Sequence, residues 1–77
     1  MDRRARISAI LRRVAGKDGL PEADESLFES GFLDSFGLPD LVSALEKEFS
    51  LTIPDADLNP RKFESIEKIE NYLDSRV

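Results

Sequence analysis

The sequence predicts a small all-α protein, a bundle of three main helices and one short helix. Three segments repeat apolar residues at helical spacings of three and four, and they start at Ile7, Leu38 and Ile66. Residues 51–54 form a short apolar connector that is too isolated to count as a strand. Helices with one apolar face bury those faces against one another, which favours a bundle. At 77 residues the chain is expected to form a single domain, 1–77.

The first helix is predicted from Arg3 to Ala15, and Gly16 is a suitable stop. Its apolar face consists of Ile7, Ile10, Leu11 and Val14. Arginines occupy the other faces, and two interpretations remain open for them. They form either a solvated surface or a contact face for a partner or for the acidic remainder of the chain. These arginines are Arg3, Arg4, Arg6, Arg12 and Arg13.

The connection from Gly16 to Leu33 is rich in glycine, proline and serine. Connections of this length are uncommon in compact domains unless something holds them down or they have a function. We expect its apolar residues to drop into the core and fix it: Leu20, Leu27, Phe28 and either Phe32 or Leu33.

The second helix follows Asp34-Ser35 and ends near Phe49 or Ser50. Asp and Ser are preferred helix caps, and a serine at a cap is presented to solvent on a rigid scaffold. Pro39 leaves the start open, because its missing N–H disfavours a helix that begins at Ser35. The regular helix begins either at Ser35 or nearer Pro39, with residues 35–37 as a looser turn that Gly37 permits. The inner face consists of Leu38, Leu41, Val42, Leu45 and Phe49.

Two capping signals place the remaining helices. Asn59-Pro60 predicts a short helix from Pro60 to Phe63, with Phe63 pointing inward. Ser65 caps the last helix. The inner stripe of this helix is Ile66, Ile69, Tyr72 and Leu73, and its outer residues are Glu67, Lys68, Glu70 and Asp74.

The composition excludes most kinds of active site. The chain has no Cys and no His, so it lacks a disulfide, a thiolate, the usual general base and the commonest metal ligand. Any chemistry at Ser35 must therefore be done by a partner. The net charge of −5 disfavours nucleic acid and favours partners with basic patches.

The sequence also bears on location. No apolar run approaches the length that spans a bilayer, and the N-terminus lacks the apolar core of a secretory signal. Its Arg-rich opening faintly suggests an organelle transit peptide, but the same residues are needed for the core. We therefore expect a cytoplasmic monomer.

Leu33-Asp34-Ser35, followed by an amphipathic helix, resembles the acyl and peptidyl carrier proteins. The likeness runs from about Leu27 to Leu73, and the Phe36-Gly37 variant is most similar to D-alanyl carriers and other free-standing aminoacyl carriers. It implies an acyl-carrier-protein-like bundle that is not an enzyme. It also implies 4′-phosphopantetheine on Ser35, added by a phosphopantetheinyl transferase that holds coenzyme A and Mg²⁺. Asp34 would either cap the helix or sit against that transferase.

The resemblance also implies a face on which partner enzymes dock. Its candidates are Phe36, Asp40, Ser43, Glu46 and Lys47. An exposed Phe36 beside the attachment serine is best explained as an apolar anchor in an interface. Pro39, Ser43 and Lys47 depart from the residues usual in the family, and this bears on which partners recognise the helix.

The sequence leaves two rival functions and several cargoes open. The first rival is an acidic helical interaction module in which Ser35 is only a helix cap. The second is a hydrolase built around Ser35, which is disfavoured because the chain lacks a base. As cargo, we favour an amino acid loaded by an adenylating ligase over a short acyl group, and either over a fatty acid. The cargo would then be passed to a downstream acyl-accepting enzyme.

Overall fold

A computed structural model of the chain describes residues 3–76, apart from the side chain of Ser35. Residues 1, 2 and 77, which the predicted domain 1–77 includes, lie outside the described part. The α-helices are α1 (Arg3–Ala15), α2 (Leu38–Phe49) and α3 (Ile66–Arg76). The 3₁₀ helices are η1 (Ser35–Gly37), η2 (Asp55–Asp57) and η3 (Pro60–Phe63). Residues 3–76 contain no strand, so the predicted all-α bundle is confirmed, with a 3₁₀ turn as its short fourth helix.

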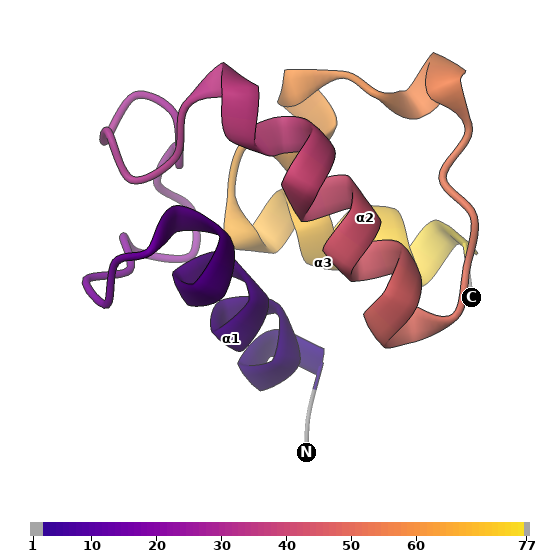
Figure 1. The fold of residues 1–77 in the computed structure, drawn as a ribbon, viewed down its shortest axis with the longest axis horizontal. Helices are drawn as coiled ribbons and strands as arrows, with labels where there is room; N and C mark the ends of the chain where they lie inside the picture. The colour runs from indigo at the N-terminus through magenta and orange to yellow at the C-terminus, as the bar shows by residue number, and fades with distance from the viewer. Residues whose placement is uncertain (1–2, 77) are drawn as a thin grey trace.

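The three α-helices surround one apolar core, and α1 contacts both α2 and α3 (Figure 1). The predicted inner faces are buried, except that Val14 and Phe49 are only partly covered at its edge. The core residues from α1, α2 and α3 are Ile7, Ile10, Leu11, Leu38, Leu41, Val42, Leu45, Ile66, Ile69, Tyr72 and Leu73. Burying these faces is what stabilises helices that are too short to persist alone in water.

The long connection between α1 and η1 is fixed by core contacts and by backbone hydrogen bonds to the start of α3. Leu27 is fully buried, and its N–H donates to the carbonyl of Glu64 at 2.6 Å. The N–H of Glu67 donates to the carbonyl of Ala23 at 3.0 Å. The sequence left a choice between Phe32 and Leu33, and the structure buries both. The connection is therefore a structured part of the fold, as expected.

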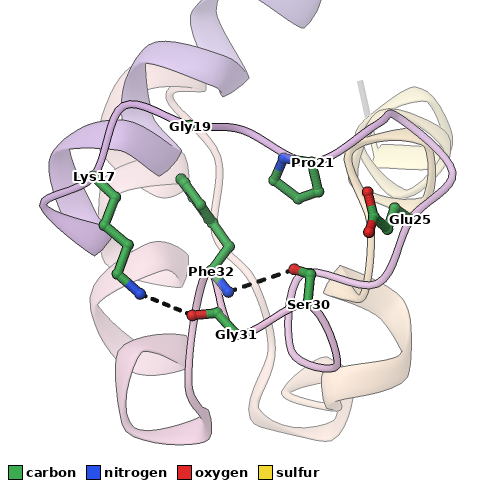
Figure 2. Close-up of a pocket in the computed structure, with 7 residues that line it drawn as sticks. All are labelled: Lys17, Gly19, Pro21, Glu25, Ser30, Gly31 and Phe32. Carbon is green, nitrogen blue, oxygen red and sulfur yellow. Dashed lines mark hydrogen bonds between the residues drawn. The ribbon is translucent and has the colours of Figure 1, made fainter.

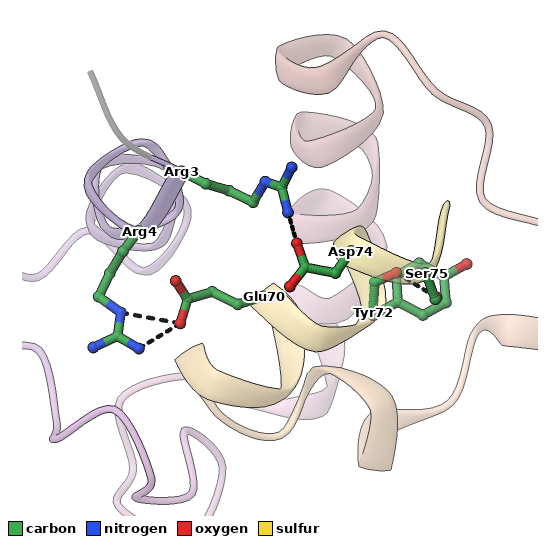
Figure 3. Close-up of polar contacts among 6 residues, drawn as sticks. All are labelled: Arg3, Arg4, Glu70, Tyr72, Asp74 and Ser75. Carbon is green, nitrogen blue, oxygen red and sulfur yellow. Dashed lines mark hydrogen bonds and ion pairs between the residues drawn. The ribbon is translucent and has the colours of Figure 1, made fainter. Parts of the chain in front are cut away.

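Three arginines of α1 pair with acidic residues of the other helices, which favours the second interpretation of the arginine face. Arg3 pairs with Asp74, and the Arg4 Nε lies 3.0 Å from the Glu70 carboxylate (Figure 3). Glu70 is consequently half-buried, although the sequence pattern predicted that it is exposed on the outer face of the helix. Arg6 donates to the Glu48 carboxylate at 2.8 Å. These pairs attach the basic helix to the acidic remainder of the chain.

Both predicted caps are present. The Asn59 Oδ1 accepts from the Arg61 N–H at 2.9 Å and so starts η3. The Ser65 Oγ accepts from the Lys68 N–H at 3.1 Å at the start of α3, and Phe63 is fully buried between the two caps. Each side-chain oxygen satisfies one backbone N–H that has no partner within its own helix.

The buried Tyr72 ties η2 to α3. Its hydroxyl donates to the Asp57 Oδ2 at 2.7 Å, and its ring packs at a tilt against Phe63 with centroids 5.1 Å apart. Burial, together with the hydrogen bond to Asp57, raises the pKa of Tyr72 to about 12. The hydrogen bonds from Tyr72 and Lys62 hold the pKa of Asp57 below its ordinary value. The segment η2 was not predicted, because its short DAD sequence carries no apolar period.

Candidate functional site

The residues just before α2 form a closed turn. The N–H of Gly37 donates to two oxygens of Asp34, the side-chain Oδ1 and the backbone carbonyl, each at 3.0 Å. Asp34 thus caps the 3₁₀ turn η1 while its side chain remains exposed. Of the two roles considered for Asp34, capping is observed, although the helix it caps is η1 rather than α2.

The regular helix α2 begins at Leu38, with Gly37 as its N-cap. Of the two starts that the sequence left open, the one nearer Pro39 is observed, and residues 35–37 form the separate turn η1. The reason is local, because Pro39 becomes the second helical residue, where the N–H has no intrahelical acceptor. A helix beginning at Ser35 would have put Pro39 deeper, at the cost of a hydrogen bond.

Packing, rather than backbone conformation, favours glycine at position 37. Its φ of −80° and ψ of −11° are ordinary for any residue. A Cβ at this position would lie 2.8 Å from the Cδ1 of Leu33, which is itself in the core. The sequence suggested conformational freedom as the reason for this glycine, and the structure corrects that.

Ser35 is the first residue of η1, and its side chain lies outside the described part of the chain. Both neighbours of Ser35 are exposed: Asp34 faces solvent, and Phe36 keeps 88% of its surface accessible. The backbone at Ser35 therefore belongs to a turn on the outside of the molecule.

The predicted docking residues divide into two groups. Asp40, Ser43 and Lys47 are exposed along one stripe of α2, following Phe36. Glu46 is half-buried, and its Oε2 accepts from the Ile53 N–H at 2.7 Å. Glu46 therefore helps to hold the connector after α2, a role that the helical pattern did not reveal.

A pocket of about 210 Å³ lies beside the turn. We call it the turn pocket, and it is lined in part by Val14, Ala15, Lys17, Leu33, Asp34 and Gly37. Sequence reasoning missed it, because the end of α1 and the turn are separated in the chain by the whole connection. The fold and this site define a class of protein: a small helical scaffold that presents an exposed turn at the head of α2.

Comparison with known proteins identifies the family. Residues 5–73 match the family described as "Phosphopantetheine attachment site", and the chain belongs to this family. It is 29% identical over 77 residues to a D-alanyl carrier protein of Leuconostoc mesenteroides, covering 100% of this chain and 99% of that protein. D-alanyl carrier proteins of Bacillus velezensis (31% over 74 residues, 95% of each chain) and Streptococcus suis (32% over 69 residues, 90% and 87%) are also similar.

The chain is therefore a carrier protein, and proteins of this family carry covalently attached 4′-phosphopantetheine. The structure fits such a group in two respects. The turn at Ser35 is flanked by exposed residues, and the adjacent turn pocket combines apolar walls with a lysine and a carboxylate. Within residues 3–76, no helix is long and apolar enough to cross a membrane.

Proposed function

We propose that Ser35 is the attachment site and that the chain carries an aminoacyl group to partner enzymes. The observation that carries this proposal is the outward turn Asp34–Gly37 at the head of α2, which lies inside the family match. The similar proteins are named D-alanyl carrier proteins, which makes a small amino acid the cargo to test first.

The attachment step needs an external enzyme. The Ser35 oxygen forms a bond to the phosphorus that bears the pantetheine of coenzyme A, the diphosphate bond breaks, and adenosine 3′,5′-bisphosphate leaves. The hydroxyl proton must pass to a base of the phosphopantetheinyl transferase, because the chain contains no His or Cys. Asp34 caps η1 and is still exposed, so it is available to the basic, Mg²⁺-bearing site of the transferase.

When bound, the group supplies a thiol on which the cargo is held as a thioester. The chain itself supplies the scaffold and the docking surface. Phe36 provides an apolar anchor next to Ser35, and Asp40, Ser43 and Lys47 extend the surface along α2. The partners are a transferase, an amino-acid-adenylating ligase and a downstream acyl-accepting enzyme. These reactions use coenzyme A and ATP, so we place the chain in the cytoplasm.

Intact mass spectrometry tests the attachment. The purified chain is incubated with coenzyme A, Mg²⁺ and a broad-specificity transferase, and we expect it to gain the mass of one phosphopantetheine. Ser35→Ala should gain nothing, whereas Ser75→Ala, which removes an exposed serine of α3 outside the docking surface, should be modified normally. Modification of Ser35→Ala would refute the assignment.

A second experiment tests the cargo and the anchor. Holo protein is offered to a D-alanine-adenylating ligase with ATP, and the thioester mass is read for a panel of amino acids and short acids. We expect loading with a small amino acid, and loading with fatty acids alone would overturn the cargo assignment.

Phe36→Ala should raise KM for the ligase without lowering thermal stability, because the side chain is almost fully exposed.

A further inference from the structure

The acidic residues of α2 differ in whether they remain available to a partner. In sequence the helix carries three acidic residues and one lysine, which suggests an acidic surface. The structure engages two of the three acids within the molecule. The Glu46 Oε2 accepts from the Ile53 N–H at 2.7 Å, and Arg6 donates to the Glu48 carboxylate at 2.8 Å and to the Glu48 carbonyl at 2.7 Å. All of α2 is described, and Asp40 is its remaining exposed acid.

Among the lysines of the chain, Lys47 is the one left available. Three of the four lysines each contact an oxygen of the chain itself. The Lys17 Nζ, for example, donates to the Gly31 carbonyl at 2.8 Å (Figure 2). The other two pairs are Lys62 with Asp57 and Lys68 with Glu64. Within the described part of residues 3–76, the side chains of Lys47 and Asp40 form neither a hydrogen bond nor an ion pair, and both are exposed.

We call the exposed residues Phe36, Asp40, Ser43 and Lys47 the docking stripe. Asp40 and Lys47 are seven positions apart, just under two helical turns, so they share one face and lie about 10 Å apart along the axis. Ser43, between them, is uncharged. The stripe therefore reads apolar, negative, neutral and positive from the head of α2. It carries no net charge, although the whole chain carries −5.

We infer that the docking stripe binds an adenylating ligase whose carrier-binding surface has the matching order: an apolar pocket, then a cation, then an acidic side chain about 10 Å further along. The inference rests on the proposed function, because it takes the ligase as the partner. The net charge alone favoured partners with basic patches. A uniformly basic surface complements Asp40 but repels Lys47, and like charges that meet in an interface are costly. Lys47 thus selects against such partners.

Charge reversal distinguishes the two kinds of ligase surface, because they predict opposite signs. Holo protein, confirmed by intact mass, is loaded by a D-alanine-adenylating ligase with ATP, and kcat and KM for the carrier are measured. Lys47→Glu should raise KM by about threefold to tenfold with kcat unchanged, since only docking is altered. A uniformly basic ligase surface would instead lower KM. Lys47→Gln should raise KM by less, and it tests the same sign if the reversal perturbs the end of α2.

A charge exchange tests the order of the charges rather than their sum. Asp40→Lys should raise KM, as Lys47→Glu does. The double variant Asp40→Lys/Lys47→Glu keeps the net charge of the wild type, and it should have a higher KM than either single variant. A double variant that docks as well as the wild type would show that only the total charge matters, and would refute the inferred order.

The chain offers a matched control for each reversal. Glu67 lies in the first turn of α3, as Asp40 does in α2, and Arg13 lies in the last turn of α1, as Lys47 does in α2. Both control residues are exposed and lie outside the stripe. Glu67→Lys and Arg13→Glu therefore repeat the change in net charge and in helix-end charge, and should leave KM unchanged.

The possible failures are distinguishable. If KM is unchanged or lower in Lys47→Glu and in Lys47→Gln, the charge order is refuted, while the attachment and the cargo stand. If the ligase never loads the wild-type holo protein, the ligase is not the partner, and this inference falls with that part of the proposed function. If the chain gains no mass, the attachment at Ser35 is refuted before any docking is measured.

Discussion

Replacing Gly37 by alanine isolates the packing at the head of α2. The added Cβ would lie 2.8 Å from the Leu33 Cδ1 and 3.4 Å from its Cγ, so Leu33 must move within the core. Inserting a methyl group into a packed site costs about 1–3 kcal/mol. Restricting the unfolded chain returns about 0.4–1 kcal/mol, because the backbone angles at Gly37 suit alanine.

The steric term is the larger of the two, so we expect Gly37→Ala to lower the free energy of unfolding by about 1–2 kcal/mol. For a domain of this size, that change lowers Tm by roughly 4–16 °C. Urea titration and thermal unfolding followed by circular dichroism measure both quantities. An unchanged m value would show that the loss is one of stability rather than of compactness.

Gly19→Ala is the matched control. A Cβ at Gly19 meets no atom within 4 Å, so this variant should be neutral or slightly more stable. If Gly37→Ala proves as stable as Gly19→Ala, the close contact with Leu33 does not constrain the turn, and the explanation given for this glycine is wrong.

Three further changes probe how the helices are held. Tyr72→Phe should cost about 1 kcal/mol through the lost hydrogen bond to Asp57. Because the folded pKa of Tyr72 is raised to about 12, from 10.0 in the unfolded chain, wild-type stability is full below pH 10 and falls as the pH rises towards 12. Tyr72→Phe should lack this alkaline decline in denaturant titrations, and retention of the decline would contradict the assignment. Arg6→Ala should lower the free energy of unfolding by about 1 kcal/mol. The variant loses the ion pair with Glu48 and the stacking of the guanidinium, whose Cζ lies 4.5 Å from the centroid of the Phe49 ring. In urea titrations, high salt should reduce the difference in unfolding free energy between Arg6→Ala and wild type only in part, since salt screens the ion pair but not the stacking. If high salt removes the whole difference, the stacking on Phe49 does not contribute. Ser65→Ala should cost about 1 kcal/mol through the lost cap of α3, and an unchanged urea midpoint would show that the cap contributes nothing.

Most of the architecture could be predicted from local patterns. The apolar periods placed α1 at Arg3–Ala15 and the inner face of α3 at the residues that are buried. The caps at Asn59 and Ser65 were also predictable, since a cap depends on only a few neighbouring residues. The Asp34-Ser35 pair with the helix after it pointed to a carrier, and the family match confirms that class.

Features that join segments far apart in the sequence could not be predicted from such local patterns. The role of Glu46 in binding the Ile53 N–H and the reason for glycine at position 37 depend on how side chains meet after folding. The turn pocket exists only because the end of α1 packs beside the turn. Periodicity and capping are properties of one segment, and they determined which helices form and which faces they bury. Packing between segments decided where α1 meets the turn, and therefore what lies next to Ser35.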